Sequence, residues 1–280
     1  MYLPVELLKA RVLITVKTYP QPSGTYGELV CTAGLFQGTH WIRIYPIPFK
    51  FLQDSQQYPK YGWVELDLVR KTSDFRLESY SPRRGIDEDI RVIDRIGTDN
   101  HWATRKQYVL QNVFTSMNDL IALAKGEQAV SLATLQPTEI VDFVIEEDAR
   151  EWKRKWLDQT KQGDIFELDD TGRMKDRQLI RKLPYKYSYK FLSQGDSKPR
   201  KVMIEDWELG ALFWNCLHQT DGDEVAANAL VRQKYFDTFV SKNDLLLFLG
   251  TTKQFHNVAP NPFIIIGVFY PPKTDQLSLF

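Results

Sequence analysis

Lysine and arginine are concentrated between residues 173 and 201, where their side chains could contact the phosphates of a nucleic acid. This basic segment holds ten cationic residues against two acidic ones, Asp176 and Asp196. The cationic residues are Arg173, Lys175, Arg177, Arg181, Lys182, Lys186, Lys190, Lys198, Arg200 and Lys201. Lysine contacts phosphate as a mobile point charge, and each neutralised phosphate adds a salt-dependent contribution to binding. We therefore predict that the basic segment contacts nucleic acid.

Aromatic residues alternate with lysines along a strand that is predicted within the basic segment. Residues 185–191 place three tyrosines and a phenylalanine on one face, with Lys186 and Lys190 on the other. An exposed aromatic face could stack bases. A half-buried strand shows the same alternation, and we favour that interpretation, in which the aromatic rings enter the core. The lysine face is then the candidate for phosphate contact.

Two groups of carboxylates could hold Mg²⁺ in a nuclease, which is an alternative function. Glu65 and Asp67 lie on one face of a predicted strand, and Glu205, Asp206 and Glu208 lie at a predicted helix start. Carboxylate oxygens bind one or two Mg²⁺ ions in such enzymes. The lysine that usually accompanies such a pair is not at the expected spacing, since a leucine follows Asp67. The second group is explained more simply by helix capping and the helix dipole. We expect no cofactor unless the protein is a nuclease, which would need Mg²⁺.

The last five residues carry three large apolar side chains, which need either a partner or the protein's own core. They are Gln276, Leu277, Ser278, Leu279 and Phe280. At all five positions the segment resembles the short peptide with which bacterial polymerases and repair proteins bind the sliding β-clamp. A peptide behind the turn at Pro271-Pro272 can reach a groove on such a partner. Packing of this tail onto the core is the alternative, and both interpretations stay open.

The overall composition is typical of a soluble globular protein. Of the 280 residues, 43% are hydrophobic and 26% charged, and the formal net charge is zero. Affinity for nucleic acid would therefore come from local surfaces. Two cysteines, Cys31 and Cys216, are too few for a disulfide framework and fit a reducing compartment. No apolar run approaches the roughly 20 residues of a membrane span, and no signal peptide is recognised. We expect a cytoplasmic protein that does not enter a membrane.

The elements that must position these residues begin with four short strands, predicted at residues 11–17, 27–35, 41–45 and 61–69. Polar and apolar residues alternate in the last two, and no long helical segment separates the four. This spacing predicts a small β-barrel or curled sheet. We assign residues 1–105 to this barrel-like domain.

The rest of the chain is predicted to mix helices and strands, so that the expected fold class is α+β. Helical patterns at 107–125 and 138–156 predict a helical connector over residues 106–172. A C-terminal α/β domain is predicted over residues 173–270, before the tail at 271–280. Its predicted strands are 185–191, 244–250 and 262–270, and its predicted helices are 204–217 and 223–239.

Most of the chain resembles an uncharacterised bacterial protein family. In the first half the resemblance lies in Val12–Phe49, through LITVKTYP, GELVCTAG and WIRIYPIPF. In the second half it lies in Glu205–Gly210, Leu245–Phe255 and Ile264–Pro272. The resemblance implies a common two-part architecture and no known activity.

These features predict a DNA-binding protein of bacterial replication, repair or genome defence that its tail recruits to the sliding β-clamp. Docking on the clamp would raise the local concentration of the protein at DNA, so that a weak DNA contact suffices. The alternatives are a metal-dependent nuclease or other nucleic-acid-processing enzyme, and an adaptor that binds only proteins.

Overall fold

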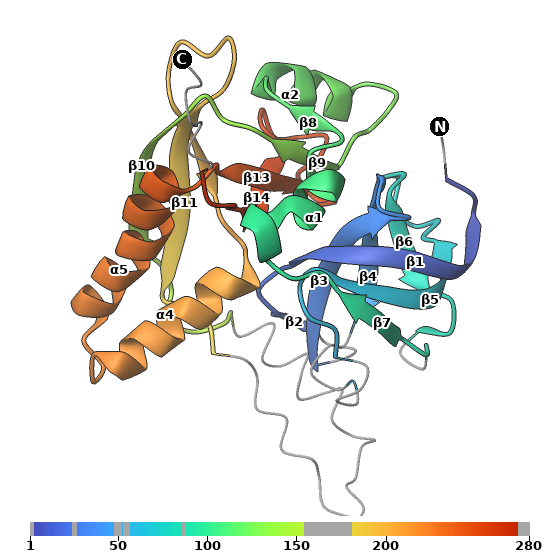
Figure 1. Cartoon of the computed structure of the whole chain (residues 1–280), viewed down its shortest axis with the longest axis horizontal. Helices are drawn as coiled ribbons and strands as arrows, with labels where there is room; N and C mark the ends of the chain where they lie inside the picture. The colour runs from blue at the N-terminus through green and yellow to red at the C-terminus, as the bar shows by residue number, and fades with distance from the viewer. Residues whose placement is uncertain are drawn as a thin grey trace, which may run out of the picture.

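Five strands at the amino end close into a barrel, which Figure 1 draws at the right. The structure is a computed structural model and describes residues 3–23, 27–47, 52, 57–85, 88–153 and 181–273. Around the barrel the strands follow the order β1-β3-β4-β6-β5, and β5 pairs back to β1. They are β1 (Glu6–Lys17), β3 (Gly27–Phe36), β4 (His40–Ile47), β5 (Gly62–Arg70) and β6 (Ser79–Pro82). Short β2 (Gln21–Ser23) pairs with β3, and β7 (Arg91–Arg95) pairs with β5.

The barrel strands are apolar on both faces over part of their length. Val12 and Ile14 of β1 belong to the cluster inside the barrel, whereas Leu13 belongs to a second cluster outside it. The predicted barrel is thus confirmed, and each of its four predicted strands overlaps an observed one. Because one exterior face is also apolar, the barrel has to pack against another layer.

The order of the strands, with β4 and β6 parallel, is the connectivity of the OB-fold, a barrel that often binds oligonucleotides or oligosaccharides. Such barrels present their second and third strands to the ligand, and the equivalents here are β3 and β4. Ala33 and Leu35 of β3 and Trp41 of β4 instead pack against the second half of the chain. The surface that other OB-folds use for ligands is therefore buried in this protein.

A four-stranded sheet covers this face of the barrel. Its order is β14-β13-β9-β8, and its strands are β8 (Val113–Phe114), β9 (Leu132–Leu135), β13 (Leu246–Thr251) and β14 (Phe263–Phe269). Leu246 and Phe248 of β13 pack toward the barrel, whereas Leu247 and Leu249 enter the core of the second half. The sheet is the middle layer of the molecule, and its apolar strand β14 is buried on both faces.

The outer layer is an antiparallel sheet that helices cover on one face (Figure 1). The buried aromatic residues of its middle strand pack in one core cluster with residues of these helices. The strands of the sheet are β10 (Glu139–Glu147), β11 (Tyr185–Leu192) and β12 (Arg200–Met203). The covering helices are α4 (Trp207–Gln219), α5 (Glu224–Arg232), a π-helical turn η5 (Gln233–Thr238) and α6 (Phe239–Lys242). Asp223 caps α5 by accepting hydrogen bonds from the backbone nitrogens of Val225 and Ala226. None of the helices in the described ranges is both long enough and apolar enough to cross a membrane.

The predicted helix over 138–156 is wrong, because residues 139–147 form strand β10. Four of these nine residues are β-branched isoleucine or valine, which favour a strand. The predicted helix over 107–125 is two helices, α1 (Asp99–Val109) and α2 (Met117–Lys125), with β8 between them. The described part of residues 106–172 therefore contributes strands to both sheets and is not simply a helical connector.

A buried polar network joins the barrel to the middle sheet. Arg43 donates to the hydroxyl of Ser131 at 3.0 Å and to the carbonyl of Thr251 at 3.3 Å. Arg76 also donates to the Thr251 carbonyl, and Glu78 accepts from the backbone nitrogen of Ser131 at 3.0 Å. Since a buried charge without a partner is strongly unfavourable, these contacts fix how the two halves dock.

Candidate functional site

Strand β11 buries its aromatic residues and leaves its lysines toward solvent. Tyr187, Tyr189 and Phe191 are all at most 1% exposed. The Tyr187 hydroxyl donates to Asn228 at 2.8 Å, and the Tyr189 hydroxyl donates to the carbonyl of Tyr235. The favoured sequence interpretation is thus confirmed, and these rings cannot stack bases.

Three lysines of the basic segment lie beside acidic residues at the end of β10, in the stretch for which the sequence predicted a helix. Lys182 and Lys186 contact the two carboxylate oxygens of Asp148 at 2.6 and 3.0 Å. Burial alone would raise the pKa of Asp148, but hydrogen bonds from both lysines lower it to about 2. Lys201 pairs with Glu146 at 3.0 Å. Glu146 of β10 and Asp148, just after the strand, therefore pair with three lysines of the basic segment.

The remaining described members of the basic segment are distributed over several environments. Arg200 pairs with Asp196 at 2.5 Å, and the Arg181 guanidinium lies 4.0 Å above the ring of Trp214. Lys190 is opposite an aspartate of β10 in the strand register, and Lys198 is exposed. Arg173, Lys175 and Arg177 lie outside the described residues, as do Gln276, Leu277, Ser278, Leu279 and Phe280.

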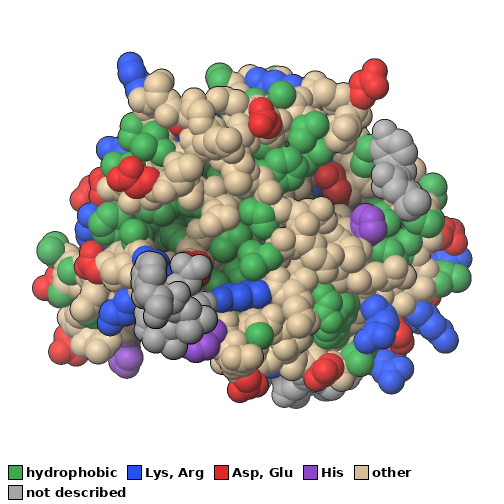
Figure 2. Space-filling model, turned by 45° about the horizontal axis from the view of Figure 1, so that its top comes forward, with side chains coloured by type: hydrophobic (Ala, Val, Ile, Leu, Met, Phe, Trp, Pro, Cys, Tyr) green, Lys and Arg blue, Asp and Glu red, His purple; other side chains and the backbone are tan. Residues whose placement is uncertain are grey.

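The charges on the molecular surface are correspondingly mixed. On the face drawn in Figure 2, Lys and Arg side chains alternate with Asp and Glu around the rim. Several Lys and Arg side chains gather at the lower right, on the side of the barrel, and hydrophobic side chains cross the middle. No field of a single sign covers this face, in agreement with the zero formal net charge.

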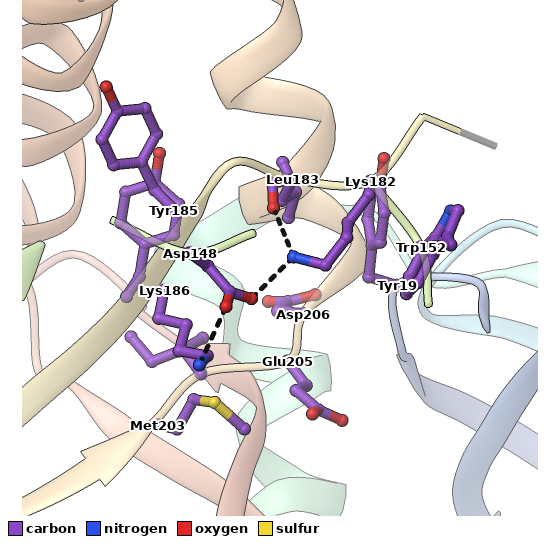
Figure 3. Close-up of a pocket in the computed structure, with 12 residues that line it drawn as sticks. Tyr19, Asp148, Trp152, Lys182, Leu183, Tyr185, Lys186, Met203, Glu205 and Asp206 are labelled. Atoms are coloured by element: carbon purple, nitrogen blue, oxygen red, sulfur yellow. Dashed lines mark hydrogen bonds and ion pairs between the residues drawn. The ribbon is translucent and has the colours of Figure 1, made fainter. Parts of the chain in front are cut away.

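A pocket of about 170 Å³ lies where the outer sheet, the start of α4 and the barrel meet. The pocket brings together residues of two candidate sites that the sequence predicted separately (Figure 3). Lys182 and Lys186 were candidates for phosphate contact, and Glu205 and Asp206 were candidates for metal binding. The lining residues are Tyr19, Asp148, Trp152, Lys182, Leu183, Tyr185, Lys186, Tyr187, Met203, Ile204, Glu205 and Asp206. The pocket therefore joins these two sets of candidate residues.

Lys182 is held too tightly in this pocket to offer its charge to a phosphate. Its ammonium donates to Asp148 at 2.6 Å, to the Ala149 carbonyl at 2.5 Å and to the Leu183 carbonyl at 3.2 Å. An ammonium group has three protons, so that these three acceptors use them all. Lys182 therefore fixes the end of β10 against the start of β11.

Tyr19, from the loop after β1, closes the pocket against α4. Its hydroxyl donates to the Arg181 carbonyl at 2.7 Å and accepts from the indole nitrogen of Trp214 at 2.9 Å. The ring lies directly on Gly210, where an added Cβ would be 2.2 Å from Tyr19 Cδ2. Only glycine leaves room for this approach of the barrel to the helix.

Asp206, which lines the pocket, also connects the two halves of the chain. Its Oδ1 caps α4 by accepting from the backbone nitrogen of Glu208 at 3.1 Å, which confirms the capping interpretation. Its Oδ2 makes no hydrogen bond within the described chain and lies 3.7 Å from the ammonium of Lys60, in the barrel. Lys60 also contacts Glu208 at 2.7 Å.

Burial shifts the pKa values of the charged residues at this contact. Because Asp206 is 2% exposed, burial raises the pKa of its carboxyl to about 6, although Lys60 acts in the opposite direction. Burial by itself would lower the pKa of Lys60, but Asp206 and Glu208 raise it above its usual value. Burial likewise raises the pKa of Glu205, whose carboxylate points away from the lysines in Figure 3. The arrangement is a charged contact between the two halves, in which burial raises the pKa of the Asp206 carboxyl above its usual value.

The carboxylates considered for a nuclease do not come together. Glu65 on β5 lies 3.5 Å from Arg91, and Asp67 accepts from the backbone nitrogen of Lys9 at 2.7 Å. Asp206 and Glu208 lie instead at the start of α4. Within the described ranges, no group of three or more His, Cys, Asp or Glu side chains is arranged to hold a metal ion.

Comparison with family models identifies both halves of the molecule. The Domain of unknown function (DUF8758) matches residues 8–111, and the Domain of unknown function (DUF8757) matches residues 113–280. The chain belongs to the DUF8757 family. A search of curated proteins found no match.

The pocket and the Lys60 contact both span the border between the two family models. Tyr19 and Lys60 lie in the DUF8758 part, whereas Asp148, Lys182 and Asp206 lie in the DUF8757 part. The DUF8757 part alone would therefore lack Tyr19 from its pocket and the cation that faces Asp206.

Sequence reasoning missed Tyr19, Lys60, Asp148 and Trp152 at this junction. The signal for Asp148 was present, because the β-branched residues before it favour a strand and would have placed it beside the lysines. For Lys60 no local signal exists, since its partner Glu208 is 148 residues away in the chain.

Proposed function

We propose that this protein binds DNA and is recruited to the bacterial sliding β-clamp by Gln276–Phe280. The observation that carries the proposal is the five-residue segment itself, which resembles the clamp-binding peptide at every position. An extended peptide of this kind binds a groove through alternate apolar side chains. Leu277, Leu279 and Phe280 would supply these side chains.

The attachment of the chain before this segment supports the proposal. The backbone nitrogen of Lys273 donates to the Lys242 carbonyl at 3.1 Å, and its ammonium donates to the carbonyls of Val240 and Ser241. Lys273 is thus fixed to the end of α6 and exposed. The seven residues that follow could span at most about 25 Å. A clamp-bound tail would therefore hold the folded part close to the clamp, at a high effective concentration.

A weak DNA contact fits this proposal better than a strong one. Four cationic side chains of the basic segment already hold carboxylates, namely Lys182, Lys186, Arg200 and Lys201. Competition from these carboxylates leaves a modest salt-dependent contribution to DNA binding. Both cysteines are free, which is compatible with the cytoplasm, where a bacterial clamp acts.

Binding to purified β-clamp tests the recruitment step. We expect the double variant Leu279→Ala/Phe280→Ala to lose at least tenfold in affinity for the clamp, equivalent to about 1.4 kcal/mol. The matched control is Val225→Ala, which removes an apolar side chain that is 80% exposed on α5. Equal clamp binding by the wild type, the double variant and the control would overturn recruitment by the tail.

Binding to labelled DNA in the absence of clamp tests the second half of the proposal. We expect binding at low salt that falls steeply as salt rises, because cations contact phosphates. Failure to bind single-stranded or duplex DNA at low salt, with clamp binding intact, would overturn DNA binding and favour the adaptor alternative.

A further inference from the structure

Three exposed aromatic rings lie on one surface of the molecule. Among the described residues, the large hydrophobic side chains that are at least 36% exposed include three aromatic ones, Tyr45, Phe75 and Phe255. Their exposures are 36%, 42% and 51%. Exposed rings of this size that gather in one place indicate a binding surface.

Contacts between loops of the two halves bring these rings together. The ammonium of Lys71 lies 4.7 Å from the centre of the Tyr45 ring. From the loop between β13 and β14, Lys253 donates to the Ser73 carbonyl in the loop between β5 and β6. In the same two loops, the ring of Phe75 lies 5.1 Å from that of His256, the neighbour of Phe255. We call Tyr45, Lys71, Phe75, Lys253 and Phe255 the aromatic–lysine surface.

The base of this surface is rigid. The fully buried His256 uses both ring nitrogens, one with the Thr251 hydroxyl at 2.7 Å and one with the Ala124 carbonyl at 2.8 Å. Beneath Phe75, the buried Asp74 and Arg76 pair at 2.6 Å. The chain that carries Phe75 and Phe255 is therefore anchored by buried neighbours, which reduces the entropic cost of binding.

The positive charge of the surface is not neutralised by its nearest carboxylate. Asp74 is the acidic residue closest in sequence to Lys71, but its two oxygens face the Arg76 guanidinium. Burial lowers the pKa of Lys71; Asp74 raises it, and Lys253 lowers it again, so that the two ammonium groups share one region. Within the described chain no ion pair holds Lys71 or Lys253, in contrast to the lysines around Asp148.

We propose that the aromatic–lysine surface binds single-stranded DNA, with unpaired bases stacked on Tyr45, Phe75 and Phe255 and phosphates at Lys71 and Lys253. Flat exposed rings require bases that are not already stacked in a duplex, and any base offers such a face. The lysines match the charge of the backbone that links those bases. The identification of the polymer as DNA rests on the function proposed above.

The test measures binding of the full chain to a labelled oligothymidylate of about 20 nucleotides and to a duplex of equal length. We expect preference for the single strand, and at least a tenfold loss for the double variant Phe75→Ala/Phe255→Ala. The matched control, Leu110→Ala/Val225→Ala, removes two exposed apolar side chains elsewhere and is expected to bind like the wild type. Thermal unfolding of both variants verifies that the fold is retained.

A second pair of variants separates the charge from the rings. Lys71→Gln/Lys253→Gln is expected to lower the slope of log affinity against log salt by about 1.4, the value for two phosphates of a single strand. Two results would overturn the proposal that this surface binds single-stranded DNA. One is wild-type affinity for the single strand in Phe75→Ala/Phe255→Ala, and the other is equal affinity of the wild type for the duplex and the single strand.

The outcomes also separate this surface from recruitment by the tail. Deletion of Gln276–Phe280 is expected to abolish clamp binding and to leave binding to the oligothymidylate unchanged. Loss of clamp binding alone in a chain that still binds the single strand supports both proposals. A chain that binds the clamp and duplex DNA but no single strand overturns only the proposal for the aromatic–lysine surface, whereas a chain that binds the clamp and neither DNA overturns DNA binding as well.

Discussion

Two regions of this protein contain the same types of residue and arrange them in opposite ways. On β11 the aromatic rings are buried, and Lys182 and Lys186 hold Asp148. On the aromatic–lysine surface the rings are exposed, and Lys71 and Lys253 hold no carboxylate within the described chain. Lysines and aromatic residues that are close together in the sequence are therefore not sufficient to form a nucleic-acid-binding surface. Their neighbours in space decide whether charge and rings are available.

The two regions differ because the carboxylates nearest to their lysines have different partners. The antiparallel register of β10 and β11 places Glu146 opposite Lys186 and Asp142 opposite Lys190, and cross-strand neighbours of opposite charge attract. In the loop between β5 and β6, the buried Arg76 binds Asp74 instead and withdraws it from Lys71. One arrangement therefore neutralises its lysines, and the other leaves them for a ligand.

The largest expected effect comes from breaking the pair beneath the aromatic–lysine surface. Asp74→Asn leaves the Arg76 charge buried without its partner, which is expected to destabilise the protein by about 3–5 kcal/mol. Unfolding in urea measures the change, with the exposed Glu127→Gln as a control expected to stay within about 0.5 kcal/mol. A loss below about 1 kcal/mol would show that the pair does not support the loop.

A smaller effect is expected on the β11 side, at Asp148. Burial would raise its pKa, but Lys182 and Lys186 lower it to about 2. A depressed carboxyl pKa contributes stability above the unfolded value near 3.9, and the contribution disappears as pH falls through about 2. Asp148→Asn is expected to cost about 1 kcal/mol at pH 7 after solvent screening. The difference from the wild type should shrink as the pH of a urea titration is lowered from 5 to 2, and a constant difference would contradict this assignment.

Removal of the β10 acids tests the neutralisation directly. The double variant Asp142→Asn/Glu146→Gln is expected to raise affinity for DNA by about threefold at low salt and to steepen the salt dependence. Glu139→Gln is the matched control, since Glu139 lies opposite Leu192 and not opposite a lysine. Unchanged affinity in the double variant would show that β10 does not shield the basic segment.

The smallest effect is expected for Lys198→Gln. Lys198 is exposed and belongs to the basic segment, yet it lies away from the proposed contact. We expect the affinity of this variant for the labelled oligothymidylate, measured by fluorescence anisotropy, to stay within twofold of the wild type. Lys253→Gln should weaken binding measurably in the same assay. Equal losses for the two variants would mean that diffuse charge, and not the aromatic–lysine surface, holds the DNA.

The parts of the fold that depend on near neighbours could be predicted. The alternation in residues 61–69 predicted a barrel strand, and helix capping explained the carboxylates near Asp206, because these features depend on residues a few positions apart. Strand β10 was missed because the predicted helix, residues 138–156, is acidic early and basic late, which is the charge pattern that a helix favours. Within the strand, the β-branched Ile140 and Ile145 lie opposite Phe191 and Tyr187. The pocket could not be predicted, since Tyr19, Asp148 and Asp206 meet only after both halves dock.

By itself, the sequence determined the α+β class, the barrel strands, the buried aromatic face of β11 and the tail segment at Gln276–Phe280. Only the tertiary structure decided which lysines keep their charge for a ligand and which face of the barrel is covered. The contacts that decide this join distant residues: Lys253 meets Ser73 across 180 positions, and Lys60 meets Glu208 across 148. Coulomb attraction and burial act over a few ångströms in space, so that only the folded chain places such residues within reach.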